Sequence, residues 1–465
     1  MFRNIADTFA NCFKIPELKS RIWFTIGVLA IVRMTAYVRV PGLDGTALSN
    51  YINSHDQGGA MSMANMFNGG ALGNCAIGGI GIMPYISATI IIQLLTAVWP
   101  KLSKLSREES GRAKIVQYGR YLTVLLCFGW GFATAISWEN PAKVFGGEIG
   151  RLVLFNDSHL WWYRIQTTLI LTTGTMLLMW LGEQITERGV GNGVSLVITI
   201  GILARIPAAW YGLHDMFGGS HPEHSFIGAG LVMVFLLAAV IAGVIAITQA
   251  QRKIPVQYAQ RAVGRKMYAG GTSFMPLKVN YAGVMPIIFA QSILMFPPII
   301  FKNASIFFSK SPFWTEIFRQ LGAALDPMTA SFWYLATYSL MILFFSYFWV
   351  ATQFNEIQIA DDLKNNGGYI PGVRPGQGTS DYLHNAMSRI TLAGAFFLMI
   401  IATLPIIIAR PDVMDINQRV ASFFGGTSIL ITVGVLLDTM RQVESHLMMR
   451  HYDGFLKKGR LRGRF

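Results

Sequence analysis

The stretch NMFNGGALGNCAIGGIGIMPYIS, residues 65–87, decides the fold because it is apolar and yet crowded with glycine. A glycine inside a helix costs about 1 kcal/mol relative to alanine, and the uninterrupted apolar run ISATIIIQLL follows at residues 86–95. The stretch suits neither water nor a simple spanning helix. Irregular backbone at membrane depth is tolerated only where protein or a cavity surrounds it. The stretch therefore predicts a re-entrant element beside a pathway through a helical bundle.

Composition indicates a polytopic membrane protein. Of the 465 residues, 52% are hydrophobic and 13% are charged, whereas a soluble domain is about 25% charged. A membrane-spanning helix needs about 20 largely apolar residues. Ten segments meet this requirement: Ile22–Val38, Ala76–Val98, Ile115–Ser137, Leu160–Leu181, Val194–Trp210, Ile227–Thr248, Ala282–Phe301, Ser331–Phe354, Ile390–Ala409 and Phe423–Thr439.

The basic residues set the predicted orientation. The net charge of +14 is compatible with nucleic-acid binding or with a membrane topology signal. With ten spans, 27 of the 38 Lys and Arg residues fall on the side of the N-terminus, and Arg33 lies within the first span. This bias follows the positive-inside rule, so both termini are predicted to be cytoplasmic. The opposite side holds the remaining ten: Arg39, Lys143, Arg151, Arg164, Arg205, Lys302, Lys310, Arg319, Arg410 and Arg419.

Two predicted cytoplasmic loops are longer than a connection requires. Residues 250–280 carry six basic residues and no acidic one, and residues 355–388 contain NNGGYIPGVRPGQGTS. Connections usually have about 4–6 residues, and longer loops tend to be functional or disordered. A solvated basic surface and a docking surface for a large, partly anionic partner explain these loops equally well.

The sequence contains no persuasive metal site. His221 and His224 lie in a predicted outer loop that supplies no further ligands. Cys12, Cys75 and Cys127 have neither disulfide nor metal-ligand spacing, so they are predicted to be small buried side chains.

Other polar motifs do not indicate catalysis either. The glycines of GVGNG, residues 189–193, follow a predicted helix rather than a strand, so they are not a phosphate-binding loop. Glu183 and Glu187 lie at positions i and i+4 near a helix end. Solvation of the helix end or contact with a partner explains them better than a proton relay.

Branched apolar residues recur on the faces of two predicted spans. Ile82 and Ile86 are four residues apart, as are Val194 and Ile198, so each pair shares one helical face. Such residues around a pore would exclude water and ions by dewetting while yielding to a larger passenger. Any membrane helix contains similar pairs, so this pattern needs independent support.

That support comes from eight motifs that resemble the SecY family, the central subunits of bacterial protein-conducting channels. They occur in the family's order from Pro41 to beyond Ile431 and read PGLDG, MFNGGAL, GIMPYISATIIIQLL, ESGRAKIVQYGRY, GTMLLMWLGEQITERGVGNG, PLKVNYAGVMPIIFA, PGVRPGQGT and FFGGTSILI.

The resemblance implies an all-α fold of ten transmembrane helices. Two inverted, pseudo-symmetric halves of five helices would surround an hourglass pore, closed by a short re-entrant plug helix. Residues 1–21 would form a cytosolic amphipathic segment, 22–211 the N-terminal half with the plug at 61–73, 212–440 the C-terminal half with cytosolic loops 250–280 and 355–388, and 441–465 a basic cytosolic tail.

The resemblance also implies roles for individual residues. The pore ring falls on Ile82, Ile86, Val194, Ile198, Ile288 and Ile431, and Val194 departs from the isoleucine that is more frequent in the family. The plug includes Met61, Met63, Asn65, Met66, Phe67, Gly69 and Gly70. A lateral gate between the second and seventh spans includes Ser87, Thr89, Ile90, Gln93, Ile287 and Gln291. Weak interhelical hydrogen bonds and ordinary polarity of packed helices explain Ser87, Thr89 and Gln93 equally well.

The two basic loops would dock the SecA motor ATPase and the ribosome. The matching residues are Arg252, Lys253, Arg265, Lys266, Arg374 and Pro375. Further implied partners are the SecE and SecG membrane subunits, signal sequences, nascent or unfolded polypeptides and membrane lipids. The chain would be a passive, gated channel of the bacterial cytoplasmic membrane, without enzymatic activity or cofactors, and nucleotide hydrolysis would belong to its partners.

Two other functions compete with this hypothesis. A secondary transporter of small solutes would also have broken helices, but it should carry a polar site at mid-membrane, and the predicted constriction is aliphatic. A membrane-bound enzyme would need convergent ionisable groups. If the plug is loosely held by its glycines, changing Gly69 and Gly70 together to alanine should slow its release.

Overall fold

The computed structural model describes most of the chain. It covers residues 15–54, 65, 67–139, 141, 152–154, 159–207, 210–211, 214, 226–258, 261–263, 266–268, 272–308, 311–326, 331–408 and 427–458. The chain forms two compact units, which we describe separately. The first unit comprises Met1–Asp215, Gln418–Phe423 and Val435–Phe465; the second comprises Met216–Asn417 and Phe424–Gly434.

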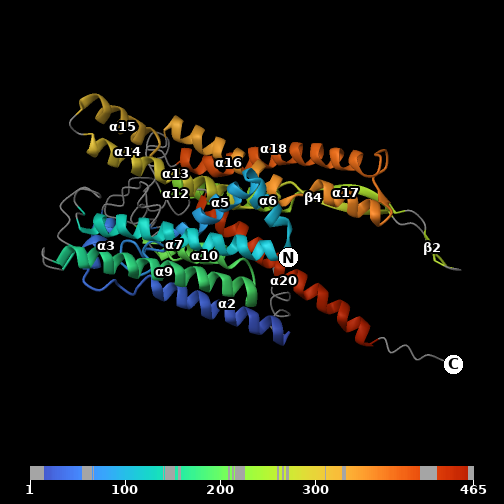
Figure 1. Cartoon of the computed structure of the whole chain (residues 1–465), viewed down its shortest axis with the longest axis horizontal. Coiled ribbons are helices and arrows are strands. Elements are labelled where there is room, and N and C mark those ends of the chain that lie inside the picture. The colour runs from blue at the N-terminus through green and yellow to red at the C-terminus, as the bar shows by residue number, and fades with distance from the viewer. Residues whose placement is uncertain are drawn as a thin grey trace. The chain divides into compact units, whose positions relative to one another are not determined.

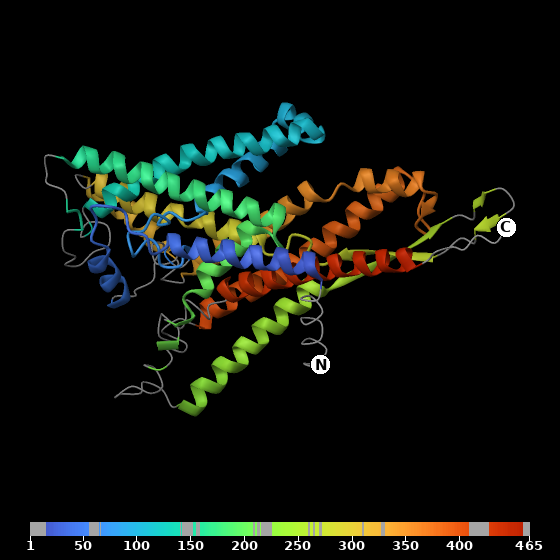
Figure 2. The ribbon, with the colours of Figure 1, turned by 90° about the horizontal axis from the view of Figure 1, so that it is seen from below.

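The first unit is built on the long helix α9 (Leu160–Arg188). Helix α7 (Glu109–Glu139) lies beside it in both views (Figures 1 and 2), and α2 (Pro16–Thr35) and α10 (Gly193–Leu203) also pack on it. The remaining helices of this unit are α3 (Gly45–Ser54), α5 (Met83–Val98), α6 (Pro100–Arg107) and the second part of α20 (Thr427–Lys458).

Local sequence explains where several of these helices begin. A proline stands in the first turn of α2, α5 and α6, where its missing N–H costs no helical hydrogen bond. Asn192 caps α10 by accepting a hydrogen bond from the N–H of Ser195 at 3.3 Å. Glycine ends α9 at Gly189 and allows the tight turn into α10.

Helix α5 is shorter than the sequence predicts. The predicted span begins at Ala76, but turns occupy residues 68–75 and 77–82, and the helix starts only at Met83. The backbone uses other partners in this region: the N–H of Ile77 donates to the carbonyl of Val38, and the N–H of Gly78 donates to the carbonyl of Thr35. The glycines therefore replace the first turns of the span with irregular backbone, whose N–H groups donate to the end of α2 and to the residues that follow it.

A buried apolar core secures this irregular backbone. Leu72, Cys75 and Ile80 are members of a cluster that also contains Trp138 of α7 and Tyr163 of α9. Cys75 and Cys127 are buried free thiols, as the sequence predicts, whereas Cys12 lies outside the described residues.

The segment between α2 and α3 joins the same core through short backbone pairings. Leu43 forms an isolated antiparallel bridge with Val153. Asp44 accepts hydrogen bonds from the N–H and the hydroxyl of Thr46, and these bonds lower the pKa of its exposed carboxyl group below the ordinary value.

The second unit contains the remaining apolar helices. Helix α16 (Phe332–Gln353) packs against α13 (Met285–Leu294) and α18 (Gln377–Ile408), and α18 also packs against α12 (Phe226–Gln249). Phe289 of α13 meets Phe345 and Trp349 of α16 edge-on, with ring centroids 5.8 and 5.3 Å apart. The unit also includes α14 (Phe296–Phe307), α15 (Pro312–Ala324), α17 (Glu356–Asn365) and the start of α20.

The seventh predicted span is not one helix. It divides into α13 and α14 at Met295, immediately before Pro297 and Pro298 in the first turn of α14. Proline cannot donate a helical hydrogen bond and clashes with the preceding turn, so it interrupts α13.

Each of the ten predicted spans coincides with at least one helix, which is consistent with the predicted count. Four helices in the described part of the chain are long and apolar enough to cross a membrane: Gly111–Glu139, Leu160–Arg188, Phe332–Asn365 and Gln377–Leu404. Shorter apolar helices include Met83–Val98 and Met285–Pro298.

The structure is mostly helical, but the two long basic loops contain β-strands that the all-α prediction missed. Strand β1 (Gln251–Tyr258) pairs with β4 (Thr272–Lys278) on one edge and with β5 (Gly368–Tyr369) on the other. We call β4–β1–β5 the loop sheet. The short strands β2 (Arg261–Val263) and β3 (Lys266–Tyr268) form the far end of the hairpin, beyond α17 (Figure 1).

Candidate functional site

Residues 65 and 67–82 of the first unit, which we call the glycine segment, contain a compact series of turns from Asn68 onward. Gly69 and Gly70 have φ angles of +62° and +89°, in the left-handed region that favours glycine. The Asn65 side chain is buried, and its Oδ1 accepts a hydrogen bond from the N–H of Gly73 at 2.9 Å. The Asn65 carbonyl accepts another from the N–H of Gly70 at 2.8 Å. Asn65 therefore holds the turn through its side chain, which accepts from Gly73, and through its backbone carbonyl, which accepts from Gly70.

Arg33 connects the glycine segment to α2. Its Nη1 donates to the carbonyl of Gly69 at 3.2 Å, and its Nη2 donates to the Tyr37 hydroxyl at 3.3 Å. The guanidinium also lies over the Tyr37 ring, 5.4 Å from the centroid. Ionisable residues inside spans are costly and usually functional. An arginine in the middle of an apolar run was the available sequence signal, yet sequence reasoning gave Arg33 no role.

Two further contacts fix the same turn. Asn68 Nδ2 donates to the carbonyl of Gly79 at 2.7 Å, so the turn binds the irregular backbone that precedes α5. Phe67 is buried, and a Cβ at Gly201 of α10 would overlap the Phe67 carbonyl oxygen. Only a glycine at 201 permits this close approach. Sequence reasoning missed both Asn68 and Gly201.

The predicted plug is only partly described. Met61, Met63 and Met66 lie outside the described residues, whereas Asn65, Phe67, Gly69 and Gly70 belong to the glycine segment. The end of the predicted plug, from Asn68 onward, is a run of turns rather than helix.

The predicted ring residues are placed on four helices. Ile82 immediately precedes α5, and its carbonyl accepts the N–H of Ile86 at 3.2 Å, so the two remain one helical turn apart. Both side chains are buried, as is Ile198 of α10, whereas Val194 is partly exposed. These four belong to the first unit; Ile288 of α13 and Ile431 of α20 are buried in the second. The ring as an assembly stays a prediction.

Among the predicted gate residues, the structure distinguishes the two explanations for Thr89. Thr89 does not form an interhelical hydrogen bond, because its hydroxyl donates to the Tyr85 carbonyl of its own helix at 2.8 Å. A threonine near an apolar surface commonly satisfies its hydroxyl in this way. Ser87 is partly buried, and Gln93 Oε1 has no hydrogen-bond partner in the described structure. Ile90 is buried in the first unit, and Ile287 and Gln291 are buried in the second.

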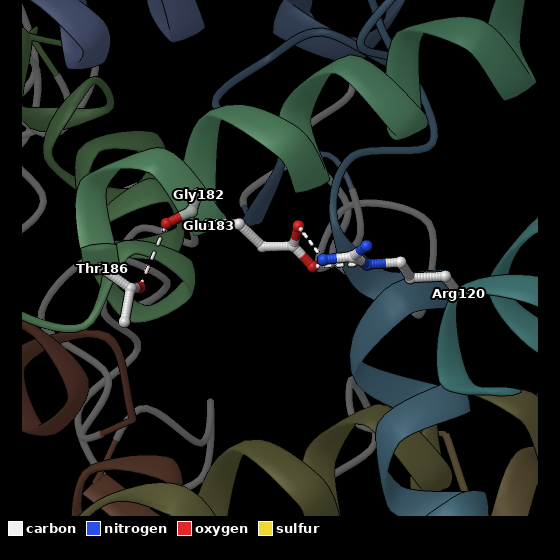
Figure 3. A network of polar contacts seen from close by, with 4 residues as sticks. All are labelled: Arg120, Gly182, Glu183 and Thr186. Carbon is white, nitrogen blue, oxygen red and sulfur yellow. Dashed lines mark hydrogen bonds and ion pairs between the residues drawn. The ribbon is translucent and has the colours of Figure 1, made fainter. Parts of the chain in front are cut away.

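Glu183 has a partner within the first unit. Figure 3 shows that its carboxylate accepts two hydrogen bonds from the guanidinium of Arg120 of α7, with Nε–Oε1 and Nη2–Oε2 distances of 3.2 and 2.8 Å. Its side chain is 17% exposed. This ion pair joins α7 to α9, and neither solvation nor an external partner is needed to explain Glu183. Glu187 is exposed.

The GVGNG turn, residues 189–193, is held by side-chain oxygens from three helices. The N–H of Val190 donates to Thr25 Oγ1 of α2 at 3.0 Å, and that of Gly191 donates to Gln442 Oε1 of α20 at 2.9 Å. The N–H of Gly193 donates to Thr186 Oγ1 at 2.9 Å, and this hydroxyl donates to Gly182 (Figure 3). These three amides fix the turn.

The predicted docking residues surround the loop sheet of the second unit. Arg252 and Lys253 are exposed on β1, and Arg374 and Pro375 are exposed between β5 and α18. Lys266 lies in β3, and Arg265 lies outside the described residues. The Arg374 carbonyl accepts a hydrogen bond from Thr379 Oγ1 at 3.0 Å, so the backbone under this arginine is tied to α18.

The loop sheet joins the two basic loops physically. Gln257 and Tyr258 of β1 pair with Tyr369 and Gly368 of β5, and the Tyr369 hydroxyl donates to Gln257 Oε1 at 2.9 Å. Beneath the sheet lies an apolar cluster with members from both loops and from the adjoining helices: Ile254, Val256, Leu277, Val350, Phe354, Ile370, Leu383, Ala386, Met387 and Ile390. Sequence reasoning treated these loops as independent.

Within the described residues, no group of three or more His, Cys, Asp or Glu side chains is placed to hold a metal ion. His221 and His224 lie outside that part of the chain.

Comparison with known proteins decides the family. The SecY family profile matches residues 76–440 of this chain. The chain belongs to the SecY family. It is 40% identical to the protein translocase subunit SecY of Chlamydia trachomatis serovar D over 468 residues, covering 98% of this chain and 99% of that protein. It is 39% identical to the Thermotoga maritima subunit, with the same coverage.

Solved channels share the fold. "The structure of a protein conducting channel" matches with a TM-score of 0.60 at 17% identity, covering 97% of this chain and 98% of the other. Sec61 in the canine ribosome–channel complex from the endoplasmic reticulum matches with a TM-score of 0.56 at 16% identity, with the same coverage. These likenesses support the fold class of the SecY family.

Proposed function

We propose that this chain is the pore-forming subunit of a channel that passes unfolded polypeptides across the bacterial cytoplasmic membrane and releases membrane segments sideways. The SecY relatives at 39–40% identity, aligned with almost the whole chain, are the observation that carries this proposal. The chain acts as a passive conduit, and its energy comes from partners. The secondary-transporter alternative is not favoured.

The glycine segment supplies the closed state. Its turn is fixed to α2 by the Arg33–Gly69 hydrogen bond and to the start of α5 by the Asn68–Gly79 hydrogen bond. Each typical hydrogen bond contributes about 0.5–1.5 kcal/mol net, and a bond to a charged donor contributes about 1.5–3 kcal/mol. A stopper held by a few such bonds stays seated at rest and leaves when a polypeptide competes for its place.

Arg33 is the main retaining residue in this proposal. Replacing it with Gln should raise the resting ion conductance of the channel in planar bilayers, because the charged donor to Gly69 is lost. Arg39 provides a matched control, since its side chain is exposed. Equal conductance of Arg33→Gln and Arg39→Gln would remove Arg33 from this role.

The six ring residues form the aliphatic seal around the passing chain. Replacing several of them with serine should also raise resting conductance, because a polar constriction no longer dewets. An unchanged leak would contradict the ring.

The loop sheet is the docking surface for the SecA motor and the ribosome. Its exposed basic residues suit acidic protein surfaces and RNA phosphates, and phosphate binding would be salt-dependent. SecE, SecG, signal sequences and lipids of the cytoplasmic membrane complete the proposed set of partners. Both termini lie in the cytoplasm.

Photocrosslinking from position 86 tests the pathway directly. A photoreactive amino acid at this position should crosslink to a stalled secretory polypeptide during translocation and not at rest. Position 125 on α7 is the matched control, because Leu125 is an exposed apolar residue of the same unit. Equal crosslinking from both positions, or none from position 86, would overturn the proposed pathway.

A further inference from the structure

Helix α15 (Pro312–Ala324) is attached to the second unit by one of its faces. Phe318 stacks on Phe301 and Phe308, with ring centroids 6.2 and 5.6 Å apart, and Gly322, one turn further on, is buried. Figure 1 shows α15 lying beside α14. Aromatic stacking against α14 therefore fixes the rotation of α15 about its own axis.

A second flank of α15 is apolar and largely uncovered by the described chain, with Ile317 partly buried between exposed neighbours. Phe313, Ile317 and Leu321 follow one another at four-residue intervals, and Trp314 lies beside them at the edge of the attached face. Residues at i, i+4 and i+8 share one side of a helix. The exposed fractions of Phe313, Trp314 and Leu321 are 69%, 50% and 42%.

The opposite flank is charged. Arg319 Nε and Nη2 donate to the Glu316 carboxylate at 3.0 and 2.9 Å, and Gln320 Nε2 donates to it at 2.9 Å. The side chains of Arg319 and Glu316 are 72% and 47% exposed. An apolar flank and a charged flank are thus both uncovered on one 13-residue helix.

Chain connectivity places α15 at the end of two apolar helices. It follows α14 closely, and α16 begins at Phe332, eight residues after Ala324. The first two residues of α16, Phe332 and Trp333, are 73% and 66% exposed. Large aromatic side chains at the start of a spanning helix are typical of the membrane–water interface.

We propose that α15 is an interfacial helix that binds the lipid bilayer surface through Phe313, Trp314, Ile317 and Leu321. The bilayer surface is the occupant that matches both flanks, because it presents acyl chains and water to the same helix. Phe332 and Trp333 are further exposed aromatic side chains at the start of α16, the helix that follows α15 and packs on it. Membrane binding by α15 therefore limits the movement of the connection between α14 and α16. This connection follows the span that is interrupted at Met295.

Spin-label accessibility tests the proposal on the full chain in vesicles of phosphatidylethanolamine and phosphatidylglycerol. Single cysteines carrying a nitroxide are placed at positions 313, 317 and 321 and, on the other flank, at 316, 319 and 323. Cys12 is replaced with serine, while the buried Cys75 and Cys127 are retained. Position 340 in α16 gives the lipid reference and position 361 in α17 gives the water reference, because Leu340 and Asp361 are exposed.

The measured quantity is the ratio of nitroxide collision rates with oxygen, which concentrates in acyl chains, and with a water-soluble nickel chelate. The ratio should be several-fold higher at 313, 317 and 321 than at 316, 319 and 323. High nickel accessibility on both flanks would overturn the proposal. Low accessibility to both reagents at 313, 317 and 321 would also overturn it, because a protein would then cover this flank.

Discussion

The glycine segment and the loop sheet are opposite cases of the relation between hydropathy and regular structure. The glycine segment is an apolar stretch that leads into the predicted span at Ala76, yet it forms turns held by the side chains of Arg33, Asn65 and Asn68. The loop sheet is built from basic, glycine-rich loops, yet it forms regular strands over an apolar cluster. Hydropathy alone therefore does not tell which region is firmly structured.

The physical basis of the two regions also differs. The apolar cluster under the loop sheet gains stability from buried area, at about 25 cal/mol per Å². The turn at Gly69 combines apolar packing of Leu72, Cys75 and Ile80 with polar contacts and glycine conformations.

Charge reversal on the docking surface should have the largest effect. Arg374→Glu should abolish motor-driven translocation in reconstituted vesicles while the channel stays folded, because Arg374 is exposed and only its carbonyl supports local structure. Lys101→Glu, an equal charge change at an exposed position of α6 in the first unit, is the control. Undiminished transport by Arg374→Glu would remove Arg374 from the docking site.

Removal of a core side chain tests whether the loop sheet is held by its apolar cluster. Leu383 is fully buried there, and Leu383→Ala should lower the local opening free energy of β1 amides by about 2–5 kcal/mol. Hydrogen exchange of those amides measures the change. Leu392→Ala on an exposed position of the same helix should leave exchange nearly unaltered. Equal exchange in both variants would show that the cluster does not stabilise the sheet.

Alanine substitutions at Gly69 and Gly70 distinguish the effect of backbone strain from the effect of steric overlap with Arg33. The sequence suggested that alanine at Gly69 and Gly70 would slow plug release, but the positive φ angles reverse this expectation. Each alanine should destabilise the turn, by about 1–2 kcal/mol from backbone strain. At Gly69 the Cβ would also overlap the Arg33 guanidinium, whereas at Gly70 it would meet open space.

Resting conductance should therefore rise in the order wild type, Gly70→Ala, Gly69→Ala. Gly27→Ala in α2 is the control, because its Cβ would meet no atom within 4 Å and its backbone is helical. Lower conductance in Gly69→Ala than in the wild type would restore the original expectation of slower release.

The smallest expected effect concerns the link between the two loops. Tyr369→Phe removes the hydrogen bond to Gln257 and should weaken β1–β5 pairing by about 0.5–1.5 kcal/mol. A double-mutant cycle with Gln257→Ala, followed by hydrogen exchange at Tyr258, isolates the coupling between the two side chains. A coupling energy of zero would mean that backbone pairing alone joins the loops.

Hydropathy predicted most helices because spanning segments must satisfy their backbone internally and face lipid with apolar side chains. It overestimated α5 and the α13–α14 span, where glycine and proline alter the backbone locally. The signals for those breaks were present in the sequence, but the length of the irregular segment before α5 depended on the carbonyl groups of Val38 and Thr35, which accept from Ile77 and Gly78.

The sequence by itself determined the helical membrane class, the family and the positions of the candidate ring, plug and docking residues. Tertiary structure alone decided which distant residues meet. Arg33 reaches a carbonyl 36 residues away, Tyr369 reaches a side chain 112 residues away, and Thr25 accepts from an amide 165 residues away. Such contacts depend on how helices and strands pack. No local pattern encodes them, because the two partners come within hydrogen-bond distance only when the whole chain has folded.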